Sequence, residues 1–217
     1  MGENVVSKQG SKMKVYTYFE KIPGINAGEQ AEQLAVWSNS WRMAGWSPVV
    51  LSDEIARILY VEMSRLQSLP SINPKGYDLA CMKRWFALRA IGGGLMTDYD
   101  VVNLGFTPSM LPSTQAGLPM CLCNYWVPAV VFTYPAGCVK LCQTLVDYVP
   151  QIGENHVSDM TIFQKVNPGT YWRLARDSSE PDLGERLVHC STHGLISRGI
   201  TTLKSQIMEQ LWRSSHE

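Results

Sequence analysis

The sequence predicts an α/β domain built on a central, mostly parallel mixed sheet with helices on both faces. Short segments rich in β-branched and aromatic residues alternate with segments whose apolar residues recur every three or four positions. The composition is 45% hydrophobic and 18% charged, and 217 residues are enough to bury a sizeable core. Strands that alternate with helices favour parallel pairing, which places ligands at the carboxyl ends of the strands.

The chain is predicted to begin with a strand, a helix and a second strand. Residues 14–19 are rich in β-branched and aromatic side chains, and residues 48–51 form a short apolar run. Residues 28–44 lie between them, and Gly45 is expected to end this helix. Its apolar residues at helical spacing are Leu34, Trp37, Trp41 and Ala44.

Two further helices are expected before the next strand. Ser52 is the predicted N-cap of the first, whose apolar face consists of Ile55, Ile58, Leu59, Met63 and Leu66. The second spans residues 77–91 and ends at the glycines 92–94, with an inner face of Leu79, Met82, Phe86 and Ala90. Residues 95–97 then form a strand that runs directly into residues 98–100.

The second half of the chain continues the alternation. Strands are expected at residues 120–123, 129–133 and 187–190. Helices are expected at residues 137–148, 158–166 and 200–212. We expect one domain over residues 13–217, preceded by a flexible polar leader at residues 1–12.

Charge and hydropathy restrict the partners of the chain. Lys plus Arg number 19 and Asp plus Glu also 19, so no basic excess favours a nucleic acid. No apolar run approaches the roughly 20 residues of a membrane span, and no signal segment is recognisable, so we expect no membrane span and a cytoplasmic location. The six cysteines lack C-x2-C spacing and are expected to be free thiols.

Residues 84–101 are the most informative for function. Asp98 and Asp100 follow a short apolar strand, at a point where a turning backbone lets both carboxylates reach one hard cation. Such a cation can clamp a diphosphate and neutralise the charge that grows on a departing nucleotide. The glycines 92–94 allow the backbone to bend sharply or to pass close to a ligand.

This segment resembles the sugar-nucleotide-binding region of glycosyltransferases with the GT-A fold, which is Rossmann-like. It most resembles the DXD-containing group of capsular-polysaccharide and initiation mannosyltransferase-like enzymes. The residues in register with that group are Arg84, Trp85, Leu88, Gly92, Gly93, Asp98, Asp100 and Val101. Residues 15–20 are similar to its opening strand. Cys81 stands where the group usually has Asp, so the identity of the donor sugar stays open.

The resemblance implies a metal-dependent hexosyltransferase, in a group that mostly retains anomeric configuration. The donor would be a nucleoside-diphosphate sugar of the UDP or GDP type, and the acceptor a hydroxyl of a glycan or another molecule. The cofactor would be Mn²⁺, or Mg²⁺, held by Asp98, Asp100 and a late histidine. His189 is favoured for this position over His193, and a hydrogen-bonded core histidine is the alternative.

The resemblance also suggests roles for residues outside the metal site. Donor binding is expected from Thr17, Tyr18, Phe19, Arg84, Gly93, Tyr99 and Lys204. Asp159 is expected to orient the acceptor hydroxyl or to act as the base, with a pure helix-capping role as the alternative. Asn155 and His156 are expected to line the acceptor pocket. The alternative for Thr17, Tyr18 and Phe19 is a plain buried strand, and for His156 it is exposure to solvent. The alternative for Arg84 is a structural ion pair, and for Lys204 it is a position on a solvated helix face.

Two other functions stay open at this point. A non-catalytic nucleotide-sugar-binding module of the same fold would share these motifs without turning over a donor. A phosphatase that forms an aspartyl-phosphate also uses an Asp-x-Asp pair, but normally directly after the first strand. The position of Asp98, behind a helix and three glycines, disfavours the phosphatase.

Overall fold

The computed structural model describes residues 12–111, 120–121, 127–166, 173–174 and 186–215. Its centre is a six-stranded sheet in the order β2-β1-β3-β6-β5-β7. The strands are β1 (Lys14–Tyr18), β2 (Ser47–Leu51), β3 (Gly94–Thr97), β5 (Met120–Cys121), β6 (Val130–Thr133) and β7 (Arg173–Leu174). β1 is parallel to β2 and β3, and β5 to β7, whereas β6 is antiparallel to β3 and β5. The sheet is therefore mixed.

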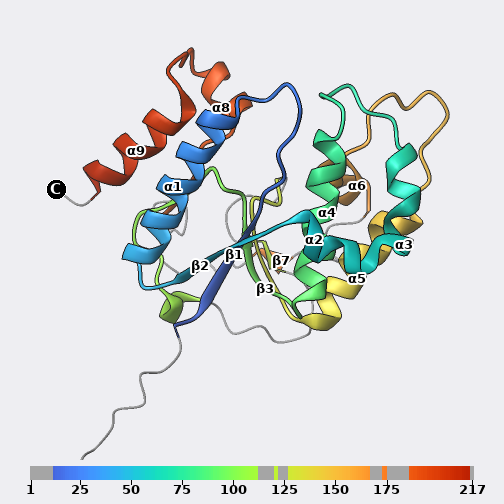
Figure 1. Cartoon of the computed structure of the whole chain (residues 1–217), viewed down its shortest axis with the longest axis horizontal. Helices are drawn as coiled ribbons and strands as arrows, with labels where there is room; N and C mark the ends of the chain where they lie inside the picture. The colour runs from blue at the N-terminus through green and yellow to red at the C-terminus, as the bar shows by residue number, and fades with distance from the viewer. Residues whose placement is uncertain (1–11, 112–119, 122–126, 167–172, 175–185, 216–217) are drawn as a thin grey trace, which may run out of the picture.

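Helices cover both faces of this sheet (Figure 1). One side carries α1 (Ala27–Met43), α8 (Thr192–Ser197) and α9 (Lys204–Ser214). The other carries α2 (Asp53–Ala56), α3 (Tyr60–Met63), α4 (Tyr77–Ala90), α5 (Pro135–Asp147) and α6 (Asp159–Lys165). The predicted α/β class, with a mixed sheet between helices, is confirmed.

The strands divide their side chains between two cores because successive side chains point to opposite faces of a sheet. On β3, Leu95 packs into the core beneath α1, and Met96 packs into the core beneath α4 and α5. The core beneath α1 is rich in indole rings, with Trp37, Trp41 and Trp46 fully buried. The high tryptophan content of the sequence is therefore largely core packing.

A second, two-stranded sheet joins distant parts of the chain. β4 (Val101–Asn103), which the sequence did not predict, pairs antiparallel with β8 (Leu187–His189). The expected strand at residues 187–190 is confirmed. The sequence Ser191-Thr192-His193-Gly194 that follows it also predicted a loop, and this prediction is wrong. Ser191 instead caps α8, because its Oγ accepts a hydrogen bond of 3.1 Å from the Gly194 backbone N–H.

The single helix expected after Ser52 is also wrong. The chain instead forms α2, the 3₁₀ turn η1 (Arg57–Leu59), α3 and the 3₁₀ turn η2 (Ser64–Ser68). A 3₁₀ helix has three residues per turn, whereas an α-helix has 3.6. Apolar residues at α-helical spacing therefore no longer lie on one face of this segment. Met63 and Leu66 are buried, whereas Ile58 is 74% exposed.

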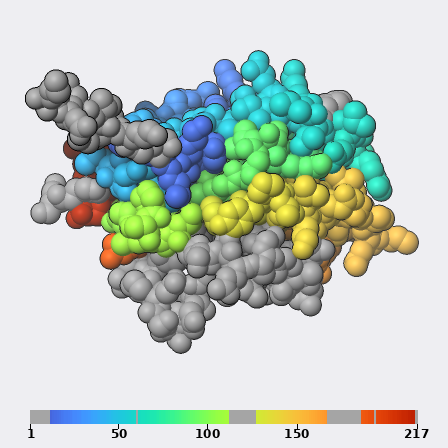
Figure 2. Space-filling view, turned by 90° about the horizontal axis from the view of Figure 1, so that it is seen from below, coloured from blue at the N-terminus to red at the C-terminus, as the bar shows by residue number. Residues whose placement is uncertain are grey.

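Figure 2 shows the end of the molecule at which β1 begins (blue), bordered by residues around the 3₁₀ turn η3 (Pro108–Met110, yellow-green) and by α5 (yellow). The carboxyl ends of the parallel strands β1 and β3 lie at the opposite end. In the described part of the chain, no helix combines the length and apolar character needed to cross a membrane. Residues 1–11 of the expected leader, and residues 122–123 of the strand expected at 120–123, lie outside the described residues.

Candidate metal centre

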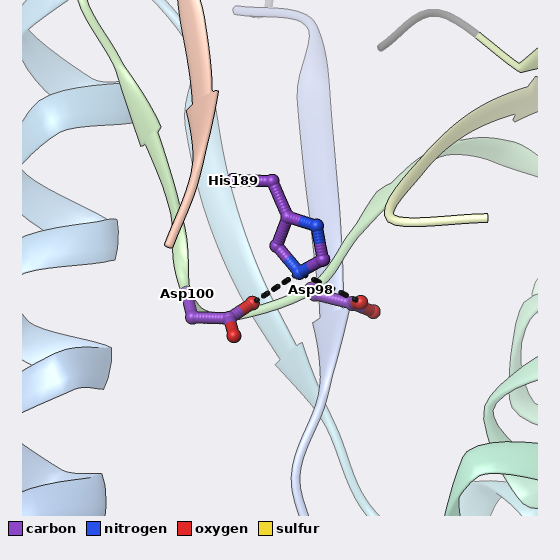
Figure 3. Close-up of side chains that lie close together, drawn as sticks. All are labelled: Asp98, Asp100 and His189. Carbon is purple, nitrogen blue, oxygen red and sulfur yellow. Dashed lines mark ion pairs between the residues drawn. The ribbon is translucent and has the colours of Figure 1, made fainter. Parts of the chain in front are cut away.

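Three elements bring Asp98, Asp100 and His189 together at the carboxyl end of β3 (Figure 3). Asp98 directly follows β3, Asp100 directly precedes β4, and His189 is the last residue of β8. The pairing of β4 with β8 sets His189 opposite Val101, and the Cys190 backbone N–H donates a hydrogen bond of 2.9 Å to the Asp100 carbonyl. The histidine is therefore placed by sheet register. These three residues are called the metal-site cluster below.

The side chains of the metal-site cluster point toward one another (Figure 3). His189 Nε2 lies 3.3 Å from Asp100 Oδ1 and 3.8 Å from Asp98 Oδ2. One ligand atom from each residue lies within 4.8 Å of the others. Asp100 Oδ1 is buried and makes no hydrogen bond with the described residues. Two carboxylates and an imidazole whose ligand atoms converge in this way fit Mn²⁺ or a similar divalent cation.

Two cationic side chains flank the two carboxylates. Lys204 Nζ lies 2.5 Å from Asp100 Oδ2, and the Arg84 guanidinium contacts Asp98 Oδ1. Lys204 is the first residue of α9, and its backbone N–H donates to Glu29 Oε1 on α1 at 2.9 Å. The solvated helix face considered for Lys204 is therefore wrong, because α9 docks on α1 and directs this side chain to Asp100.

Burial and neighbouring charges shift the protonation of the cluster. Burial raises the pKa of Asp98 to about 6, against the opposing effect of Arg84. Burial alone would raise the pKa of Asp100, but His189 and Lys204 outweigh it and hold that pKa below its usual range. Burial alone would lower the pKa of His189, but the two carboxylates raise it. The two carboxylates therefore differ in proton affinity, and a proton on His189 competes with any bound cation.

Asp159 does not have the arrangement expected of a base. It is 3% exposed, and its Oδ2 accepts hydrogen bonds from Arg84 Nη2 at 2.7 Å, Arg84 Nε at 3.1 Å and Trp85 Nε1 at 2.8 Å. Its Oδ1 accepts from the Met160 backbone N–H at 2.8 Å. Ser158, not Asp159, caps α6, in a capping box with Thr161. Asp159 therefore binds Arg84 in the interior, which corrects the expectation of a carboxylate that faces the acceptor.

The end of β1 provides fewer side chains to a ligand than expected. Thr17 is fully buried, and Tyr18 is 7% exposed with its hydroxyl donating to Glu20 Oε2 at 2.8 Å. Their side chains are therefore not open to a base, which fits the alternative of a plain buried strand. Donor binding through their backbone groups stays a prediction. Phe19 is half-buried and packs edge-on against Tyr99, with ring centroids 5.9 Å apart. Of the three candidates, Phe19 remains next to the metal-site cluster.

Gly93 lies just before β3, at the end of this strand opposite to the metal-site cluster. Four residues lie between it and Asp98, so the two positions are five steps apart, roughly 16 Å in extended conformation. Its φ is +91°, and a Cβ at this position would lie 2.6 Å from the Thr133 carbonyl oxygen. The position requires glycine for a structural reason, because α4 turns into β3 directly against β6. Donor binding by Gly93 is not needed to explain this glycine and stays a prediction.

The expected acceptor residues lie near the start of α4. Asn155 is exposed, and His156 Nδ1 lies 3.5 Å from the buried Asp78 Oδ2. The Asp78 carboxylate also accepts hydrogen bonds from Ser71 Oγ and from Asn73 Nδ2, the latter at 3.0 Å to Oδ1. No contact described here tests the acceptor role of Asn155 and His156, which stays a prediction.

Two residues near the cluster were missed from the sequence. Gln30 on α1 is 4% exposed and donates through Nε2 to the Tyr99 hydroxyl at 3.0 Å. Tyr77 begins α4, and the pKa of its phenol is raised by Cys81, by burial and by both aspartates of the cluster. The available signal for Gln30 was its position one and two turns before Leu34 and Trp37, on the face of the helix predicted to be apolar. Tyr77 carried no signal, because only tertiary packing brings the start of α4 to this site.

Comparisons with known proteins provide no further guide. No family model, no curated protein and no solved structure matches this chain. A function for this chain is therefore inferred from the geometry of the site.

Proposed function

We propose that this chain is a metal-dependent glycosyltransferase that transfers a sugar from a nucleoside-diphosphate sugar to an acceptor hydroxyl. The observation that carries the proposal is the meeting of Asp98, Asp100 and His189 at the carboxyl end of β3, with ligand atoms within 4.8 Å of one another. Carboxyl ends of strands in open α/β sheets are where ligands commonly bind. The resemblance of residues 84–101 to the DXD-containing group supports the same reading.

The metal-site cluster would hold Mn²⁺ or Mg²⁺ through Asp98, Asp100 and His189 Nε2. A divalent cation bound there neutralises the charge that develops on the departing diphosphate. Lys204, whose ammonium group is at the edge of the cluster, would contact the same diphosphate once Asp100 engages the cation. Phe19 and Tyr99, which already pack together, would offer an aromatic surface to the nucleoside.

The proposal assigns Asp159 no chemical step, since its carboxylate is buried and both of its oxygens accept hydrogen bonds. Arg84 would hold Asp98 in place rather than bind the donor, because its guanidinium lies between two carboxylates. The acceptor would be a glycan or another hydroxyl compound. We also propose a cytoplasmic location, which suits the free thiols of Cys81, Cys138, Cys142 and Cys190.

The test is a thermal-shift panel of UDP-, GDP- and dTDP-sugars with and without Mn²⁺, followed by an assay of nucleoside diphosphate release. One donor is expected to raise the melting temperature only with Mn²⁺, because a ligand that binds the native state stabilises it. The double variant Asp98→Asn with Asp100→Asn is expected to lose both stabilisation and release. Asp147→Asn, on α5, is the control, because the Asp147 carboxylate accepts a hydrogen bond from Gln143 Nε2 and lies outside the cluster.

Three outcomes of this test distinguish the candidate functions. Stabilisation with release of the nucleoside diphosphate supports the transferase. Stabilisation without release, in the presence of a range of hydroxyl acceptors, indicates a nucleotide-sugar-binding module instead. Stabilisation that persists in the double variant would refute the assignment of the metal site to Asp98 and Asp100.

A further inference from the structure

We infer that Asp159 is a positioning residue that acts on the metal-site cluster through Arg84. This inference rests on the metal site of the proposed function and adds to it a residue on α6. The three side chains form a continuous line. The Asp159 carboxylate accepts hydrogen bonds from Arg84 Nε and Nη2, and Arg84 Nη1 contacts the Asp98 carboxylate. Asp159 and Asp98 therefore hold opposite sides of one guanidinium.

Two of the three side chains are buried, and Asp98 is partly buried, so water screens their charges only weakly. Asp159 is 3% exposed and Arg84 is 8% exposed. Charges in such an environment are weakly screened, and a buried charge that loses its partner is costly. A planar guanidinium, unlike an ammonium group, has donors in fixed directions and can bind two carboxylates at once. The geometry therefore fixes the orientation of Asp98 as well as its charge environment.

Asp159 also balances the charge of Arg84. Within the described residues, the carboxylates that contact Arg84 are those of Asp159 and Asp98. The Asp159 carboxylate offsets the positive charge of Arg84, so that charge is not directed at Asp98 alone and the Asp98 carboxylate stays available to a metal cation. Without the negative charge of Asp159, Arg84 would pair fully with Asp98 and compete with the cation for its oxygens.

Neighbouring residues on α4 and α6 hold the Asp159 side chain in place. Its Oδ2 also accepts a hydrogen bond from Trp85 Nε1 at 2.8 Å, and Phe163 packs edge-on against the Trp85 ring with centroids 5.6 Å apart. Ser158 caps the helix directly before it. Outer-shell residues that hold a metal ligand in this way commonly contribute about ten- to a hundredfold to metal affinity.

The test measures Mn²⁺ affinity directly, from the electron paramagnetic resonance signal of free Mn²⁺, in the full chain without any donor. Asp159→Asn is expected to bind Mn²⁺ about tenfold or more weakly than the unmodified protein. Asp78→Asn, an equally buried aspartate that contacts neither Arg84 nor Asp98, is expected to leave the affinity unchanged. Thermal unfolding identifies the temperature at which both variants are folded for the measurement.

A second pair of variants tests whether the effect passes through Arg84. Arg84→Lys keeps the charge but cannot hold both carboxylates, so it is expected to weaken Mn²⁺ binding even if Asp159→Asn does not fold. In an Arg84→Gln background, Asp159→Asn is expected to change the affinity less than threefold, because the intermediary is gone. A tenfold loss in that background would mean that Asp159 acts on the cation directly and would overturn the inference.

The two proposals fail differently. If the unmodified chain binds no Mn²⁺, the metal site is refuted and the inference with it. If the unmodified chain binds Mn²⁺ and Asp159→Asn and Arg84→Lys bind it equally well, only the inference is overturned.

Discussion

The ammonium group of Lys204 lies 2.5 Å from Asp100 Oδ2, which links the start of α9 to the turn between β3 and β4. Two contacts dock α9 on α1 beside this ion pair: the Lys204 backbone N–H donates to Glu29 Oε1, and Ser205 Oγ donates to Glu32 Oε2, both at 2.9 Å. The lysine side chain is 16% exposed, so water screens the pair only in part. Lys204 thus neutralises a carboxylate that the proposed cation also needs.

Replacing Lys204 by methionine should separate metal binding from diphosphate binding. Lys204→Met removes the competing cation, so Mn²⁺ is expected to bind about three- to tenfold more tightly, on the order of 1 kcal/mol. The same variant is expected to bind a nucleoside diphosphate more weakly with Mn²⁺ present, because one cationic contact is lost. Calorimetric titration of each ligand measures both changes. Lys165→Met, which breaks the Lys165–Glu154 ion pair elsewhere, is the control. Weaker Mn²⁺ binding in Lys204→Met would contradict the prediction.

Mn²⁺ affinity is expected to rise with pH. The carboxylates raise the pKa of His189, and the pKa of Asp98 is about 6, so both groups hold protons at mildly acidic pH that a cation must displace. The gain is at most about tenfold per pH unit for each proton displaced and ends once pH exceeds both values. His189→Gln should bind Mn²⁺ more weakly and with a shallower pH dependence. Affinities measured from pH 5.5 to 8.5 check this, and equal slopes in both proteins would argue against His189 as a ligand.

Two neighbouring buried threonines should respond differently to valine. Thr97 Oγ1 accepts a hydrogen bond of 2.8 Å from Trp37 Nε1, so Thr97→Val leaves a buried indole N–H without its acceptor. We expect a loss of about 1–3 kcal/mol in the free energy of unfolding. Thr17 Oγ1 has no hydrogen-bond partner among the described residues, so Thr17→Val should be neutral or slightly stabilising. Urea denaturation of both variants measures the difference, and equal losses would contradict it.

The glycines before β3 provide a matched pair for backbone strain. Gly92 and Gly93 have φ values of +87° and +91°, but only at Gly93 would a Cβ approach backbone atoms, 2.6 Å from the Thr133 carbonyl oxygen. Gly92→Ala should cost about 1–2 kcal/mol, from the left-handed backbone alone. Gly93→Ala should cost distinctly more, about 3 kcal/mol or above, since strand β6 must also shift. Urea denaturation compares the two, and similar losses would argue against the close contact.

The same Gly93→Ala variant tests whether Gly93 contributes to the metal site. Gly93 lies at the opposite end of β3 from the metal-site cluster, so Mn²⁺ affinity should be unchanged at temperatures where the variant is folded. A large loss of Mn²⁺ affinity in the folded variant would contradict this prediction.

Helices with local signals were predicted well from the sequence. The helix expected at residues 28–44 is observed as Ala27–Met43, and that expected at 77–91 as Tyr77–Ala90. In the first, Asn26 caps the start by accepting hydrogen bonds from the Gly28 and Glu29 backbone N–H groups. Apolar spacing and capping act within one or two turns, so they can be read from a short stretch of chain.

Features that depend on distant contacts were predicted poorly. The strand β4 was missed because its three residues are stabilised by pairing with β8, far along the chain. The resemblance led us to expect that Asp159 faces an acceptor. Its position beside a helix cap is compatible with either exposure or burial, so the sequence could not decide between them. Its partner Arg84 lies on another helix, and only the packing of α4 against α6 selects burial.

By itself, the sequence predicted the α/β class and the position of the Asp-x-Asp pair after a strand. Those features follow from periodicity, from turn residues and from residue types that suit a cation. The expectation that His189 joins the pair came from the resemblance to the DXD-containing group. The tertiary structure alone decided that Lys204 and Arg84 neutralise the two carboxylates, and that Asp159 holds Arg84. The reason is physical: ion pairs form between groups that folding brings together, and their burial and charge depend on neighbours that no local pattern records.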